Sequence, residues 1–185
     1  MSANDGDDFI KQETDWLAVP LREGAPFLGI CLGAQMLCRH LGGTVSGHSD
    51  GLVEIGWYRL RTTKAGRDLM GEDWPDLIYQ WHSEGMTTPD GARCLASSEA
   101  FGCQAFAYGP AALAIQFHVE LTQAMVHRWT TLGAPRLALP NAQTRAAHLK
   151  GRLLHDHKTR AWLDRFLDHW FDMDARAGHA RSEAA

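Results

Sequence analysis

The chain has 185 residues, a formal net charge of −4 at pH 7, and hydrophobic and charged fractions of 45% and 22%. This length can form one α/β domain with a substantial core, and the composition is that of a soluble globular protein. The negative charge, without a cluster of lysine and arginine, argues against nucleic acid as a partner. No apolar run reaches the length of a membrane span, so we expect no membrane partner either.

The N-terminus and the cysteines indicate the compartment. The first eight residues are acidic and lack the charged and then apolar layout of a signal peptide. The histidines show no metal-ligand spacing. We therefore expect a cytoplasmic protein that uses no metal and no cofactor. The four cysteines, which form no Cys-x-x-Cys pair and no disulfide-like framework, are Cys31, Cys38, Cys94 and Cys103.

Local signals predict helix and strand in alternation over the first part of the chain. A helix is expected over Asp8–Ala18, where apolar residues recur at helical spacing, and Pro20 should end it. A short apolar strand then leads to Cys31. The helix that follows is expected to reach about Leu41 and to stop at the glycine pair 42–43, a strong C-terminal signal.

The middle of the chain is expected to be mostly extended. Residues Val45–Thr63 read as strand, and the apolar phase changes across Gly56, as a β-bulge would cause. A short helix is expected over Ala65–Met70 and a turn over Thr87–Gly91. The other predicted strands are Leu77–Trp81, Arg93–Ala96, Gln104–Ala107 and Leu113–Val119.

The last third is expected to be helical. Thr122 caps a helix over Leu121–Leu132, and after a loop with two prolines Asn141 caps a second helix that runs to about Leu154. The final helix carries a broad apolar stripe, which we expect to pack on the protein's own sheet rather than to dock a partner. The stripe consists of Trp162, Leu163, Phe166, Leu167, Trp170 and Phe171.

The most informative stretch is Pro26–Leu37, where Gly29–Gly33 has the form Gly-x-nucleophile-x-Gly. That pattern suits a sharp strand-to-helix turn that raises one side chain above a sheet. Glycine is expected on both sides because a Cβ would collide with the neighbouring backbone. Cys31 would lie at a helix N-terminus, where free N–H groups and the helix dipole stabilise a thiolate. The alternative is a buried cysteine in a packing turn rich in alanine and glycine.

A second stretch, Leu113–Glu120, complements the first. Apolar and polar residues alternate, so a strand would put His118 and Glu120 on the same face. A carboxylate two residues beyond a histidine can hold one imidazole nitrogen and leave the other free, which orients a general base. Alone, such a pair is more often a surface ion pair. Together with Cys31 it completes a triad of thiol, imidazole and carboxylate.

These motifs resemble those of the class I glutamine amidotransferases, most closely the group similar to the glutaminase domain of GMP synthase. The resemblance rests on Gly-Ile-Cys-Leu-Gly-Ala-Gln at 29–35 and Gln-Phe-His-Val-Glu at 116–120, and it covers nearly the whole chain. It implies an α/β fold with a flavodoxin-like open sheet, an added β segment and C-terminal helices. Residues 1–133 would form an N-terminally truncated amidotransferase domain, and residues 134–185 a helical extension that packs on it.

Carried over residue by residue, the resemblance makes Cys31 the nucleophile, His118 the base and then the acid, and Glu120 the orienting carboxylate. Glutamine is the implied small-molecule substrate: the thiolate attacks its side-chain amide, ammonia leaves, and water hydrolyses the γ-glutamyl thioester. In this family the ammonia usually passes to a synthase partner or domain. No such domain is recognisable in these 185 residues, and the acceptor stays open.

The resemblance also implies a set of substrate-binding residues. Gln35, one turn after the cysteine, would help to hold the substrate glutamine. Ser83, preceded by His82, belongs to the loop that binds the α-amino and carboxylate ends of the substrate. The backbone N–H of Leu32 would supply one hydrogen bond to the oxyanion.

The sequence departs from the pattern of the family in three places. Val119 replaces the usual proline and Glu84 the usual aspartate, and neither side chain has to act in the chemistry. The third departure is larger, because in the family a Gly-Gly-Pro loop and the opening strands precede the segment that resembles Met1–Asp5. A backbone N–H of that loop completes the oxyanion hole, and loss of one such donor costs about 3–4 kcal/mol. We therefore expect a truncated reading frame and an exposed edge at the cysteine strand.

Other functions remain open at this point. A γ-glutamyl hydrolase would use the same triad on γ-linked peptides or polyamines in a wider pocket. A fragment or a catalytically impaired relative would keep the turn around Cys31 as a fold element and only bind a partner. Ammonia release from glutamine, cleavage of γ-glutamyl conjugates and labelling of Cys31 by a glutamine-like electrophile separate these hypotheses.

Overall fold

The computed structural model describes residues 1–183, with side chains up to Phe171. The fold is mixed α/β and is built on an open five-stranded sheet in the order β1-β9-β8-β7-β4. β1 and β9 pair in parallel, and the other neighbours pair antiparallel. The strands are β1 (Phe27–Ile30), β9 (Ala112–Ile115), β8 (Ala105–Tyr108), β7 (Arg93–Ser97) and β4 (Arg61–Thr62).

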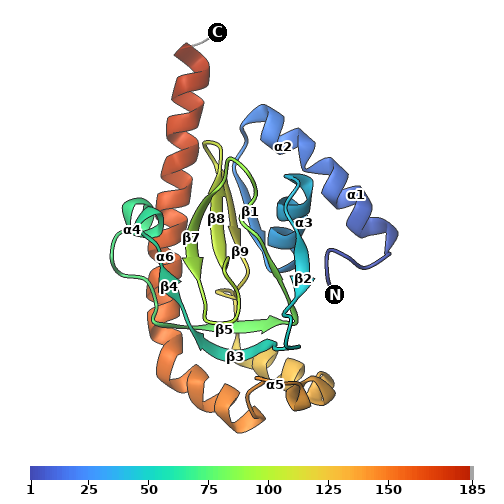
Figure 1. Ribbon diagram of the computed structural model, residues 1–185. Helices are drawn as coiled ribbons and strands as arrows, with labels where there is room; N and C mark the ends of the chain where they lie inside the picture. Colours follow the sequence, from blue (N-terminus) through green and yellow to red (C-terminus); the bar gives the residue numbers. More distant parts are fainter. Residues whose placement is uncertain (184–185) are drawn as a thin grey trace.

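Two antiparallel ribbons complete the β structure. β2 (Val45–Gly47) pairs with β6 (Glu84–Met86), and β3 (Glu54–Arg59) pairs with β5 (Leu77–His82). Figure 1 shows the β3–β5 ribbon running across one end of the five-stranded sheet. This arrangement places β5 close to the end of the sheet at which β1 leads into the next helix.

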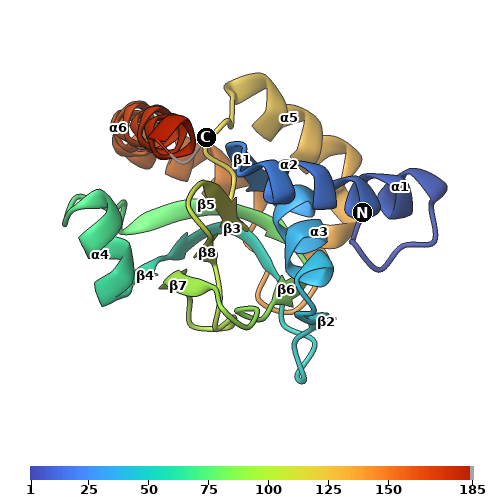
Figure 2. The same cartoon turned by 90° about the horizontal axis from the view of Figure 1, so that it is seen from above.

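Helices lie on both sides of the five-stranded sheet, as Figures 1 and 2 show. α1 (Asp8–Trp16) and α3 (Leu32–His40) pack on one face, and α6 (Arg145–Glu183) packs on the other. The remaining helices are α2 (Ala18–Glu23), α4 (Lys64–Met70), α5 (Gln123–Leu132) and the short 3-10 helix η1 (Ala134–Ala138).

Alternate residues of the central strands contribute to two separate cores. Phe106, Ala112 and Ala114 pack with the residues of α1 and α3. Leu113 and Ile115 point to the opposite face and pack with residues of α6. Because helices cover both faces, all four residues of β9 are buried. β1 is an edge of this sheet, as the sequence predicted, since within the described residues it pairs with β9 alone.

The N-terminal helix differs from the prediction. The helix expected over Asp8–Ala18 ends at Trp16, and α2 begins at Ala18, with the buried Leu17 between them. Pro20 does not end a helix but lies in the first turn of α2. Its missing N–H is no loss there, because the first N–H groups of a helix have no partner within the helix.

Three predicted helices are confirmed with small differences at their ends. The helix after Cys31 spans Leu32–His40, and the short helix expected at 65–70 spans Lys64–Met70. α5 begins after Thr122, whose side chain accepts a hydrogen bond from the backbone N–H of Met125.

β3 has no bulge at Gly56. It pairs with β5 without a register shift, from Glu54 opposite His82 to Arg59 opposite Leu77. The alternation of apolar residues changes across Gly56 for another reason, because both faces of β3 are covered there. Gln143 lies so close that a Cβ on Gly56 would be 2.5 Å from its Oε1 atom.

The strand predicted over Leu113–Val119 ends at Ile115. Beyond it, the backbone N–H of Gln116 still donates to Gln104, but the N–H of His118 donates to the carbonyl of Tyr79 in β5 at 2.9 Å. The chain thus leaves the five-stranded sheet and turns toward β5. This crossing, and not the alternation of a strand, positions His118 and Glu120.

The C-terminal part forms one long helix instead of the two predicted. Asn141 has a φ of 72° and its side chain donates to the carbonyl of Val53, so it does not cap a helix. Thr144 takes that place, because its Oγ1 accepts from the N–H of Ala147 at 3.3 Å. α6 then continues through the predicted end at Leu154.

The apolar stripe of α6 packs on the sheet in part. Trp162 and Phe166 are buried in the core beside β9, whereas Phe171 is exposed. That residues 134–185 form an extension of the same domain stays a prediction, and its last two residues lie outside the described part of the chain. No helix within residues 1–183 is both long and apolar enough to cross a membrane.

Candidate active site

Cys31 lies at the carboxyl end of β1, on the turn that enters α3. Its backbone has φ 49° and ψ −100°, a strained conformation for a residue with a Cβ. The N–H of Cys31 donates to the carbonyl of Ile115, and its carbonyl accepts from the N–H of Gln35. A Cβ on Gly29 would lie 2.7 Å from backbone atoms of Gly33, so this glycine is required. The same expectation for Gly33 is wrong, because a Cβ there would meet open space.

His118 lies between a carboxylate and the thiol. Its Nδ1 is 2.7 Å from Oε1 of Glu120, and the ring lines the same cavity as Cys31, which acts on the pKa of the imidazole. The ring also packs edge-on against Trp129, with 4.8 Å between the ring centroids. Because Glu120 engages Nδ1, Nε2 is the nitrogen left for the sulfur. The arrangement fixes the position of the imidazole, and it leaves Nε2 as the nitrogen that loses its proton when the ring becomes neutral.

Opposing effects set the charges of this pair. Burial alone would lower the pKa of His118, but the hydrogen bonds with Cys31 and Glu120, together with the charges of both groups, raise this pKa to about 9. Burial alone would raise the pKa of Glu120, but the hydrogen bond and the charge of His118 lower it overall. At neutral pH the site therefore holds an imidazolium next to an ionised carboxylate.

The side chains of Cys31, His118 and Glu120 line one cavity of about 640 Å³. Trp81 from β5 and Trp129 from α5 contribute aromatic surface to its wall. The cavity is thus mainly apolar with a few polar groups that converge on the sulfur, which is the usual character of a small-molecule site.

One cationic residue of this cavity was not predicted from the sequence. Arg136 donates from Nη2 to Oγ of Ser83 at 2.9 Å, and its guanidinium lies 5.7 Å from the centroid of the Trp81 ring. Burial lowers the pKa of Arg136, while the charge of Cys31 acts in the opposite direction. No sequence signal singled out this arginine, because it lies on η1 and reaches the cavity only through the packing of that segment.

The predicted substrate-binding residues do not all line the cavity that contains Cys31. Leu32 lines the cavity, and Ser83 contacts a residue that does. His82 is instead part of a buried polar cluster, where its Nε2 is 3.3 Å from Oε2 of Glu54 and its Nδ1 is 2.9 Å from the carbonyl oxygen of Glu84. The direct roles of these residues in substrate binding stay predictions.

Gln35 is held by protein groups on all sides. Its Oε1 accepts from the N–H of Ala3, and its Nε2 donates to the carbonyl of Glu84 and to Oε1 of Gln116. Gln116 in turn donates from Nε2 to the sulfur of Cys31 at 3.5 Å. Gln116 is the first residue of the Gln-Phe-His-Val-Glu motif at 116–120. The alternation of polar and apolar residues in that motif gave no reason to expect the Gln116 side chain beside the sulfur of Cys31.

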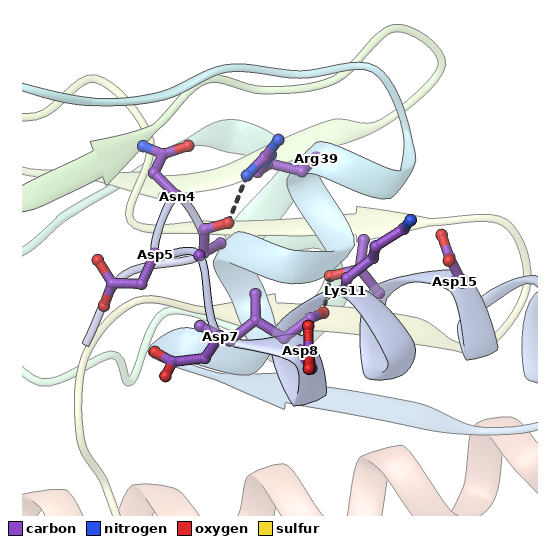
Figure 3. Close-up of a pocket in the computed structure, with 11 residues that line it drawn as sticks. Asn4, Asp5, Asp7, Asp8, Lys11, Asp15 and Arg39 are labelled. Carbon is purple, nitrogen blue, oxygen red and sulfur yellow. Dashed lines mark hydrogen bonds between the residues drawn. The ribbon is translucent and has the colours of Figure 1, made fainter.

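The N-terminal segment is tied to α3 beside the site. Arg39 donates to the backbone carbonyl of Ala3, as Figure 3 shows, and Asn4 donates to the carbonyl of Val45 at 2.8 Å. A second cavity, of about 430 Å³, lies here and is lined by aspartates and by two cationic side chains. Among the described residues, no group of three or more histidine, cysteine or acidic side chains could hold a metal ion. Met1 itself lines the cavity that contains Cys31.

The fold and this cysteine turn define a known class of protein. The family model described as glutamine amidotransferase class-I matches residues 11–127. The chain therefore belongs to the class I glutamine amidotransferases, which confirms the resemblance seen in the sequence and the open-sheet α/β fold that it implied.

Curated relatives of the chain carry the name GMP synthase [glutamine-hydrolyzing]. The protein of Cytophaga hutchinsonii is 36% identical over 108 residues, which are 56% of this chain and 21% of that protein. The protein of Methanospirillum hungatei, whose name marks it as one subunit of GMP synthase, is 31% identical over 106 residues, or 55% of this chain and 54% of that protein. The matched part is thus about a fifth of the first relative and about half of the second.

Solved structures give the same result for the fold. A glutamine amidotransferase from Thermotoga maritima superposes with a TM-score of 0.80 at 29% identity, covering 92% of this chain and 74% of that chain. A glutamine amido transferase from Methylobacillus flagellatus superposes with a TM-score of 0.83 over 94% of this chain and 73% of that chain. At 23% identity, the second structure supports the fold alone.

Proposed function

We propose that the chain releases ammonia from the side-chain amide of glutamine, with Cys31, His118 and Glu120 as its catalytic triad. The observation that carries the proposal is a strained turn that places a thiol in one cavity with an imidazole, which a carboxylate orients through Nδ1 at 2.7 Å. Membership of the family supports glutamine as the substrate.

The first half of the proposed reaction forms a thioester. The thiolate of Cys31 attacks the amide carbon, and the electron pair of the carbonyl moves to its oxygen. The backbone N–H of Leu32, in the first turn of α3, donates a hydrogen bond to this oxyanion. The C–N bond then breaks, and His118 gives its proton to the leaving ammonia.

The second half hydrolyses the thioester. His118, now neutral, takes a proton from water, and the water oxygen attacks the thioester carbon. When this intermediate collapses, the C–S bond breaks and its electron pair returns to the sulfur of Cys31. Glutamate leaves, and the resting pair of thiolate and imidazolium is restored.

Arg136 is proposed to bind the α-carboxylate of the substrate. It is the one guanidinium among the described residues that line the cavity, and Ser83 and Trp81 hold it in place. A guanidinium presents several N–H donors in a planar fork that matches a carboxylate. This role would place the γ-amide of glutamine on the opposite side of the cavity, toward the sulfur.

The ammonia is proposed to pass to a synthase, present as a separate chain or a further domain. The names of the relatives support this, because one of them is named as a single subunit of GMP synthase. A cytoplasmic location is also proposed. It is supported by the four cysteines, which are free thiols, as a reducing compartment would keep them.

The decisive experiment measures ammonia release from glutamine by the wild type, by Cys31→Ala and by Cys94→Ser. We expect Cys31→Ala to lose at least about 10³-fold in kcat, since the nucleophile is gone. Cys94→Ser should keep the activity because Cys94 is outside the cavity. Retained ammonia release by Cys31→Ala would refute the proposal. Faster cleavage of γ-glutamyl conjugates than of glutamine would assign the chain to γ-glutamyl hydrolysis instead.

A further inference from the structure

Two buried glutamines connect the sulfur of Cys31 to the backbone of β6. Gln116 donates from Nε2 to the sulfur at 3.5 Å, and its Oε1 accepts from Nε2 of Gln35 at 3.2 Å. Gln35 also donates to the carbonyl of Glu84, the first residue of β6, at 3.0 Å. Neither side-chain amide takes part in the proposed steps of thioester formation and hydrolysis.

The backbone decides which way both amides point. Oε1 of Gln35 faces the N–H of Ala3, which can only donate, and its Nε2 faces the carbonyl of Glu84, which can only accept. The amide of Gln35 can therefore stand in one orientation only. Its second N–H meets Gln116, which must present its oxygen there. The NH₂ group of Gln116 is consequently directed at Cys31 and not its carbonyl.

Water does not compete for this donor. Gln116 is fully buried and Gln35 is 2% exposed. A hydrogen bond from a buried, fixed N–H to an ionised acceptor is stronger than one between neutral groups, and it needs no reorganisation when the charge appears. The acceptor here is the atom that alternates between thiolate and thioester.

We propose that Gln116 is a catalytic residue that stabilises the thiolate of Cys31, and that Gln35 is a positioning residue that fixes the orientation of the Gln116 amide. This inference rests on the proposed thioester reaction. The effect is largest where negative charge is on the sulfur, in the resting enzyme and when the C–S bond breaks and its electron pair returns to the sulfur. In the thioester itself the sulfur is neutral and the hydrogen bond is weak.

The first test compares two substitutions in the full chain. Gln116→Glu keeps an oxygen for Gln35 and turns a second oxygen toward the sulfur, and Gln116→Met removes the donor at similar size. In each folded variant, we expect the alkylation of Cys31 by iodoacetamide at pH 7, followed by mass spectrometry of its peptide, to slow about tenfold. Gln123→Glu, an exposed change on α5, is the matched control and should react as the wild type does.

A second readout separates a catalytic role from a merely structural one. Because the donor assists departure of the sulfur, the trapped γ-glutamyl thioester should make up a larger fraction of Gln116→Met than of the wild type at saturating glutamine. Wild-type rates of alkylation in folded Gln116→Met would overturn the proposal, and so would an unchanged thioester fraction.

A third measurement needs no variant. In the assigned NMR spectrum of the wild type, the side-chain NH₂ signals of Gln116 should shift when Cys31 is alkylated. Those of Gln143, which is bonded to the backbone of Trp57, should stay in place. Unmoved Gln116 signals would refute the inference even if both variants failed to fold. Neither alkylation nor NMR uses glutamine, so this failure is distinct from a failure of the ammonia assay.

Discussion

The pKa of His118 is the electrostatic property of the site that a pH profile measures most directly. Its burial disfavours the charged imidazole, yet the hydrogen bonds and charges of Cys31 and Glu120 outweigh burial and raise its pKa to about 9. The proposed mechanism needs this proton in the free enzyme, since it goes to the leaving ammonia. A raised pKa therefore extends activity toward alkaline pH.

This reasoning predicts the alkaline limb of the pH profile. We expect kcat/KM for ammonia release to stay level on the alkaline side of neutrality and to fall as the pH rises through about 9, where His118 loses its proton. Glu120→Gln keeps an oxygen opposite Nδ1 but removes the negative charge, so its alkaline limb should move to lower pH. A wild-type limb near the ordinary histidine value of about 6.5 would contradict the assignment.

At the scale of single elements, the turn between β1 and α3 offers a matched pair of glycines. A Cβ on Gly29 would press on backbone atoms of Gly33 and Ala34 at 2.7–2.8 Å, and backbone cannot move aside as a flexible side chain can. Gly29→Ala should lower the free energy of unfolding by at least about 2 kcal/mol. Gly33→Ala, which meets nothing within 4 Å, should change it by less than about 1 kcal/mol. Urea denaturation of both variants measures the difference, and equal losses would show that the two glycines are equivalent.

Elements set by local signals were the predictable ones. The strand-to-helix turn at Cys31 and the helix cap at Thr122 are indicated by neighbouring residues, and both are found where the sequence indicates them. The end of β9 is different, because it depends on the N–H of His118 pairing with Tyr79, a residue of another sheet. Pairing between distant segments leaves no signal in the local pattern of apolar residues.

The residues of the candidate site also fall into two groups, those that a sequence motif predicts and those that only tertiary packing brings to the cavity. The association of Cys31, His118 and Glu120 could be predicted because a motif and its spacing carry it, whereas their roles still await kinetics. Arg136 could not be predicted, since it lies in a short 3-10 helix whose place is decided by packing against Trp81 and Ser83. His82, whose role in substrate binding stays a prediction, lies in a buried polar cluster with Glu54.

At the scale of the whole molecule, the long helix α6 contributes one of the two cores that enclose the sheet. Trp162 is 1% exposed and packs against Phe117 and Phe166, with ring centroids 5.9 and 4.8 Å away. Such a large buried ring removes much apolar surface from water. A helix that served only to dock another protein would not need it.

The stability of the entire chain should therefore depend on α6. Trp162→Ala is expected to lower the free energy of unfolding by about 3–5 kcal/mol, as the loss of a buried aromatic side chain does. Leu153→Ala on the same helix, where the side chain is 79% exposed, should change it by no more than about 0.5 kcal/mol. Urea denaturation followed by circular dichroism checks both, and a small effect of Trp162→Ala would mean that α6 folds apart from the sheet.

The position of the first residues has a practical consequence for anyone who prepares this protein. Met1 lines the cavity that contains the sulfur, and the N–H of Ala3 holds the amide of Gln35. A purification tag or linker joined ahead of Met1 would emerge at the mouth of that cavity and pull on the same short segment. Recombinant protein of these 185 residues that is meant for enzymology should therefore carry its tag at the C-terminal end, or have a tag at Met1 removed without leaving extra residues.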